Sequence, residues 1–184
     1  MMSAEFARRL RLFDGRRTST AATWMVSGIA ISATSSLARL RIGDFALSNV
    51  PVENFDEWSV PSVPLTVGLP VFARFRMMLD LAGSELWLRA ANEDLARPFT
   101  RDRTGLGVAY EGDHLRVVHV AAGSPVSKTG WKAGETIART DGHPVGGDYV
   151  ASGLSRWRYG PEHSTVQLEL RQHKTRPIEL IDYY

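Results

Sequence analysis

The spacing of apolar residues along the chain predicts a mainly β protein with short helices. The first segment, residues 3–12, has a helical period, because its apolar side chains recur every three or four residues while its arginines fall on the opposite side. From Thr20 onward apolar and polar residues alternate, which is the period of a half-buried strand. We expect Gly28 at the tip of the first hairpin in this region.

The same alternation continues through the first half of the chain. It predicts strands over 39–52 and a second hairpin over 76–88. Between them, the polar segment 53–64 contains two prolines and predicts a loop, and Pro70 suits the first turn of a short helix.

A boundary divides the chain into two predicted domains. Residues 92–104 are charged, contain a proline and have no clear period, as is typical of a linker. We therefore expect a first domain over 1–91 and a second over 105–184.

The second domain has its own series of elements, marked by turn residues. Ser124 and Pro125 are suited to begin a short helix that Gly130 ends, and Asp141-Gly142 is typical of a type I′ hairpin turn. The other expected elements are strands over 115–120, 136–140, 165–171 and 177–181, and a helix over 148–157.

Composition narrows the possible partners. The 184 residues are 43% hydrophobic, which suffices for one ordinary core or two small ones. The net charge of +2 is spread over both halves without a concentrated basic stripe, so we expect no nucleic-acid binding. The absence of cysteine removes disulfides, thiolate metal sites and cysteine nucleophiles.

The uncharged stretch 18–38 is the one segment that resembles a membrane span or an export signal. Nine of its residues are Ser or Thr, so it is too polar to span a bilayer, and Arg16-Arg17 is followed by Thr-Ser-Thr rather than by an apolar run. We expect no membrane span, and the compartment stays open.

Side chains suited to catalysis are sparse. The five histidines lack the spacing of a metal site, and no serine lies in a Gly-x-Ser-x-Gly elbow. Asp80 and Glu85 could form a carboxylate pair, but their place at a hairpin turn favours a structural role. We therefore expect no catalytic residue, no bound metal and no cofactor.

Gly105-Leu106-Gly107-Val108 is followed at intervals along the chain by Ser124-Pro125, Gly130, Ala133-Gly134 and Asp141-Gly142. Taken together, these motifs make residues 105–184 resemble a PDZ domain. The order of elements is similar to the circularly permuted bacterial type, in which the strand at 177–181 replaces the strand that comes first in animal members. The resemblance implies a partly open β-barrel with two helices that binds polypeptide C-termini or unfolded protein.

The resemblance also implies the residues of the site. Backbone amides of the Gly105–Val108 loop would bind the terminal carboxylate, since residues without Cβ let neighbouring N–H groups converge on one anion. The peptide would add a strand beside the one that follows. The side-chain pocket would be lined by Val108, Tyr110, Val150 and Leu154, or these residues would simply fill the core.

Residues 3–90 carry a second resemblance. The segments that carry it are 3–10, Val26-Ser27-Gly28, 40–44, 49–52 and above all 67–80. They resemble the downstream part of a retropepsin-like aspartic protease lobe of the bacterial type, in which Gly28 would lie at the position of the flap.

The chain departs from that family where the chemistry is carried out. It contains neither Asp-Thr-Gly nor Asp-Ser-Gly, and Asp14-Gly15 and Asp141-Gly142 lack the hydroxyl residue between. We expect a peptide-binding module joined to a truncated, catalytically incomplete lobe.

Two alternatives stay open. The chain could be a fragment of an active aspartic endopeptidase, acting in proteolysis, whose catalytic Asp lies upstream of Met1; related proteins are often exported, with a leader that would lie outside this chain. Otherwise it could be a non-catalytic assembly protein, a homodimer joined through exposed strand edges.

Overall fold

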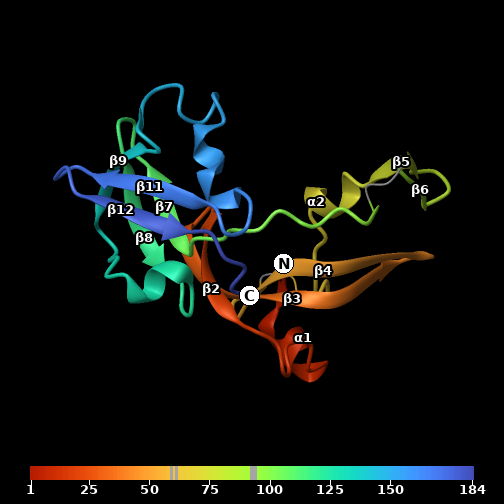
Figure 1. Ribbon diagram of the computed structural model, residues 1–184. Coiled ribbons are helices and arrows are strands. Elements are labelled where there is room, and N and C mark those ends of the chain that lie inside the picture. The colour runs from red at the N-terminus through yellow and green to blue at the C-terminus, as the bar shows by residue number, and fades with distance from the viewer. Residues whose placement is uncertain (59, 61, 92–94) are drawn as a thin grey trace. The chain divides into compact units, whose positions relative to one another are not determined.

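The computed structural model describes residues 1–58, 60, 62–91 and 95–184. The chain folds into two compact units, one formed by Met1–Arg16 with Ser35–Phe99 and the other by Arg17–Thr34 with Thr100–Tyr184. The mainly β class with short helices is confirmed, and the sheets do not close into a barrel within the described residues (Figure 1).

The first unit combines short helices with two groups of strands. Its elements are β1 (Met2–Ser3), α1 (Ala4–Arg9), the later part of β3 (Gly28–Ile42), β4 (Phe45–Phe55), α2 (Leu69–Phe72), β5 (Phe75–Asp80) and β6 (Glu85–Ala90). β1 pairs in parallel with β4, β4 neighbours β3, and β5 pairs with β6 in a separate antiparallel hairpin. The hairpin predicted over 76–88 is thus confirmed.

Helix α1 is shorter than the predicted segment 3–12. The Ser3 side chain accepts a hydrogen bond from the Phe6 amide and caps the first turn. The helix ends by Leu10, because Arg11 has a φ of 51°, in the left-handed region. The chain then turns rather than extending the helix to Leu12.

The second unit is built on an antiparallel sheet with the strand order β12-β11-β9-β8-β7 (Figure 1). Its elements are β2 (Ser19–Met25), the first part of β3, β7 (Leu106–Tyr110), β8 (Leu115–Val120), η2 (Pro125–Lys128), β9 (Thr136–Thr140), β10 (His143–Pro144), η3 (Leu154–Tyr159), β11 (Thr165–Leu170) and β12 (Thr175–Glu179). Fully buried side chains from several strands form one core, among them Leu106, Val117, Ile137 and Leu168. The strands and the short helix after Ser124 are confirmed.

Residues 17–34 belong to the second unit, although the sequence places all of 1–91 in the first. In β2, the Ser19 hydroxyl donates to the Ala122 carbonyl. Thr20 Oγ1 lies 2.8 Å from His119 Nε2 and accepts a hydrogen bond from the Ala122 amide. These contacts join residues about a hundred positions apart, which local periodicity does not record.

The predicted helix over 148–157 is wrong in its first half. Residues 148–153 form turns, and a 3-10 helix begins only after Gly153, whose φ of 80° does not fit a right-handed helix. Trp157 anchors η3 because its buried indole N–H donates to the Tyr149 hydroxyl at 2.6 Å.

Gly105 allows the close approach that begins β7. Its φ is 82°, and a Cβ built on it would overlap the Ser124 side chain, which is itself held by a hydrogen bond to the Ala121 carbonyl. Gly112 has the same φ but open space around it. Comparing the cost of a substitution at Gly105 with that at Gly112 therefore separates backbone strain from crowding.

We predict that Gly105→Ala lowers the free energy of unfolding by about 1–3 kcal/mol more than Gly112→Ala, because both substitutions strain the backbone but only the first overpacks the interior. Urea unfolding of the two variants and the parent protein measures the difference. Equal losses would contradict the packing assigned to Gly105.

Candidate functional site

Strand β7 lies at the end of the sheet of the second unit. It pairs with β8 on one side and has no strand partner on its other side among the described residues. Such an edge presents backbone N–H and C=O groups that another strand can use. The direction of each group along β7 decides what the edge offers.

Val108 directs its backbone groups toward the open edge. Its cross-strand partner, Val117, donates its N–H to Glu135 O and accepts at its C=O from Gly134 N–H, both at 2.8 Å and both away from β7. Val108 and Val117 therefore form a non-hydrogen-bonded antiparallel pair, so the N–H and C=O of Val108 point outward. By the same alternation those of Tyr110 point outward too.

The edge is closed at Leu106. The Leu106 amide donates to Thr104 Oγ1 at 3.1 Å, and its carbonyl accepts from Arg158 Nη2 at 2.6 Å. Both outward groups of Leu106 thus have partners within the protein, whereas Val108 and Tyr110 lie along the open part of the edge. The backbone groups of Gly107 point the other way, toward β8, where Gly107 pairs with His119.

An internal carboxylate occupies the loop before β7. Asp102 Oδ1 accepts from the Thr104 amide and hydroxyl, both at 2.8 Å, and from the Gly105 amide at a longer 3.4 Å. Asp102 Oδ2 accepts from Arg158 Nη2 at 2.9 Å. The first amides of the Gly-Leu-Gly-Val segment are therefore already engaged, and the Val108 amide is the one that faces the open edge.

The Asp102–Arg158 pair lies in a largely dry environment. Burial lowers the pKa of Arg158, but the charge of Asp102 and the hydrogen bond to it outweigh burial and hold the pKa above its ordinary value. Burial and the same negative charge raise the pKa of Tyr183. The guanidinium is therefore charged at neutral pH.

The predicted pocket residues differ in exposure. Val108 and Leu154 are partly buried and pack against the same core. Tyr110 donates its hydroxyl proton to the Gly146 carbonyl at 2.7 Å and stacks on Tyr149 with ring centroids 5.9 Å apart. Val150 is 60% exposed. Apolar surface is thus present on both β7 and the 148–159 segment, although Val108 and Leu154 also serve the core.

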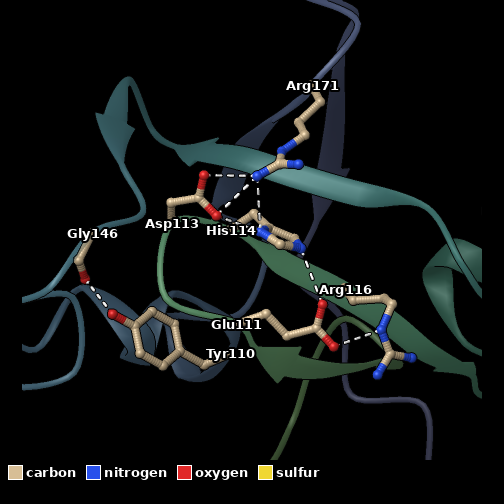
Figure 2. Close-up of polar contacts among 7 residues, drawn as sticks. All are labelled: Tyr110, Glu111, Asp113, His114, Arg116, Gly146 and Arg171. Atoms are coloured by element: carbon tan, nitrogen blue, oxygen red, sulfur yellow. Dashed lines mark hydrogen bonds and ion pairs between the residues drawn. The ribbon is translucent and has the colours of Figure 1, made fainter.

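The turn between β7 and β8 is held by a polar cluster (Figure 2). His114 lies between two carboxylates, with Nδ1 2.6 Å from Asp113 and Nε2 3.0 Å from Glu111. Arg116 donates to Glu111 at 2.7 Å, and Arg171 reaches Asp113 from the end of β11. Sequence reasoning missed this cluster, because it judged the histidines by metal spacing and Arg171 is 58 positions from Asp113.

The remaining sequence-predicted positions lie elsewhere. The hairpin turn lies at 26–27, so Gly28 is not at its tip as predicted; it begins β3 within the second unit and is exposed, with a φ of 124°. Asp80 Oδ1 accepts from the Ala82 and Gly83 amides, both at 3.0 Å, which confirms its role in the hairpin turn. Within the described residues, no group of three or more His, Asp or Glu side chains could hold a metal ion.

No protein-family model matches the chain, and no curated protein matches it. In the part of the chain that the structure describes, every helix is too short or too polar to cross a membrane.

The polar cluster predicts acid sensitivity. Hydrogen bonds, first from Arg116 and then from His114, lower the pKa of Glu111 below its ordinary 4.5. The hydrogen bond with His114 is the largest cause that lowers the pKa of Asp113 below its ordinary 3.8. A lowered folded-state pKa stabilises the fold above the unfolded-state value, and this stabilisation disappears as the pH falls through the folded-state value. The free energy of unfolding should therefore decrease as the pH falls below these ordinary values.

Denaturant unfolding across this pH range measures the effect in the parent protein, Glu111→Gln and Asp113→Asn. Each variant should show a shallower decrease toward acid than the parent. Asp44→Asn, in an exposed turn of the first unit, serves as the control. A decrease of unchanged steepness in both cluster variants would contradict the assignment.

Proposed function

We propose that the second unit binds the C-terminal segment of a polypeptide as a strand added along β7. The observation that carries the proposal is the edge itself: Val108 and Tyr110 turn their backbone groups outward, while Leu106 is closed by Thr104 and Arg158. An added strand gains its affinity from main-chain hydrogen bonds to such an edge. The resemblance of 105–184 to a PDZ domain supports the same reading.

The closed end explains why a chain terminus is favoured over an internal segment. A strand pairing with Tyr110 and Val108 cannot continue its hydrogen bonds past Leu106, because those groups already have partners. A terminal carboxylate needs no further pairing, and it accepts a strong hydrogen bond from the Val108 amide. The ligand in this proposal is therefore a peptide that ends opposite Val108.

The ligand's last side chain meets apolar surface in this arrangement. Val108 and Leu154 present partly buried aliphatic groups, and Val150 lies exposed in the segment before η3. Burying an aliphatic side chain removes its apolar surface from water, which favours binding. We therefore assign an apolar C-terminal residue to the ligand.

The first unit has a secondary place in the proposal. It is taken as a retropepsin-like lobe that lacks the Asp-Thr-Gly or Asp-Ser-Gly triplet, so it supplies no paired carboxylates to activate water. Binding, rather than hydrolysis, is the activity proposed for this chain.

We predict that a fluorescent peptide ending in an apolar residue binds about 10–100-fold more tightly as the free acid than as the C-terminal amide, the range expected for a charge-assisted hydrogen bond. Fluorescence anisotropy with the full chain measures both dissociation constants. Equal affinities would refute recognition of the terminus.

The outward Val108 amide gives a second prediction. Val108→Pro removes this donor without breaking the pairing with β8, and edge strands tolerate proline at such a position. The free-acid peptide should then bind about 10–100-fold more weakly.

Val108→Thr is the matched control. Threonine keeps the amide and the branched shape but adds a hydroxyl beside the apolar surface, so Val108→Thr should weaken binding clearly less than Val108→Pro does. Equal binding by the proline and threonine variants would place the ligand away from β7. Circular dichroism of both variants checks that the sheet is retained.

A further inference from the structure

We propose that Arg158 is the specificity-determining residue that attracts the ligand's terminal carboxylate, and that Asp102 is an internal carboxylate that moderates this attraction. The inference rests on the proposed function, because it concerns how the open end of β7 distinguishes a charged chain end from a neutral one. Neither residue was among the site residues predicted from the sequence.

Arg158 lies where the added strand must end. It comes from η3, and its Nη2 donates to the Leu106 carbonyl at 2.6 Å. The next outward group along the edge is the Val108 amide, which binds the ligand's carboxylate in the proposed complex. A carboxylate at that amide is therefore a close neighbour of the guanidinium.

A cation at this point favours a carboxylate ligand. The Leu106 carbonyl oxygen carries a partial negative charge and points outward, so by itself it would repel a carboxylate bound at Val108. A guanidinium on that oxygen replaces the repulsion with attraction. The Arg158 side chain is 21% exposed, so solvent screens its charge less than that of a surface arginine.

Arg158 can attract a further carboxylate without losing its present partners. Among the described residues, Arg158 Nε is buried and has no hydrogen-bond partner. Its Nη2 donates to both the Leu106 carbonyl and Asp102 Oδ2. Because Nε lies out of a ligand's reach, the attraction comes from the charge of the guanidinium, which extends beyond the two groups that Nη2 already binds.

Asp102 opposes the ligand's carboxylate. Its Oδ2 pairs with Arg158 while its Oδ1 holds the Thr104 amide and hydroxyl. It therefore keeps the loop in shape in the free protein and neutralises part of the charge that a ligand would meet. Replacing its charge while keeping its shape should leave a stronger attraction for anions.

The test compares free-acid and amidated forms of one apolar-ended peptide against the full chain and four variants. The measured quantity is selectivity, the ratio of the amide's dissociation constant to that of the free acid. Arg158→Gln should lower the selectivity about tenfold and Arg158→Lys should lower it less, since lysine keeps the charge but not the fork geometry. The affinity for the amide should change little.

Asp102→Asn should raise the selectivity about two- to fivefold, as expected for removing one partly screened competing charge. Arg156→Gln is the matched control, because Arg156 lies on the same short helix but is exposed. Its selectivity should equal that of the parent.

The outcomes separate the inference from the function it rests on. A parent protein that binds both peptides equally, or neither, overturns the proposed function. A parent that prefers the free acid while Arg158→Gln keeps that preference overturns the inference alone, as does an equal loss of affinity for both peptides. If Arg158→Gln does not fold, Arg158→Lys and Asp102→Asn decide. Unchanged selectivity in the lysine variant, or unchanged or lower selectivity in Asp102→Asn, is then the overturning result.

Discussion

The ion pair between Asp102 and Arg158 is the interaction on which the candidate site depends. It joins the segment before β7 to η3, and the Arg103 amide strengthens the junction by donating to the Arg158 carbonyl at 3.0 Å. Arg103 in turn binds Asp182 near the C-terminus. Breaking a mostly buried ion pair would leave an uncompensated charge in the interior, which is energetically costly. The pair therefore holds the start of β7 in place.

This constraint shapes the edge that β7 presents. Leu106 is tied to Thr104 and Arg158 at one end. At the other end the His114 cluster fixes the turn after Tyr110 (Figure 2). Between two fixed ends, the middle of the edge keeps its backbone groups directed outward. A rigid strand with an open centre can accept another strand with little cost of ordering.

Much of the local structure could be predicted from the sequence, because it depends on residues close together in the chain. The Asp141-Gly142 turn forms with positive φ at both residues, and the short helix after Ser124 forms as expected. The helix over 148–157 could not be placed correctly, since the apolar spacing suggested a continuous helix while Gly153 turns the backbone into the left-handed region. The turn and the short helix could thus be predicted from neighbouring residues, whereas the break that Gly153 introduces into the 148–157 segment could not.

The sequence by itself determined the strands, the turns and the glycine-containing segment at 105–108, because period, turn residues and missing Cβ atoms act locally. Only the tertiary structure decided that residues 17–34 pack with the second unit, that Asp102 already occupies the loop amides, and that Arg158 closes the edge at Leu106. These features rest on hydrogen bonds and ion pairs between residues distant in the chain. No local pattern encodes such pairings, because the chain brings the partners together only when it folds.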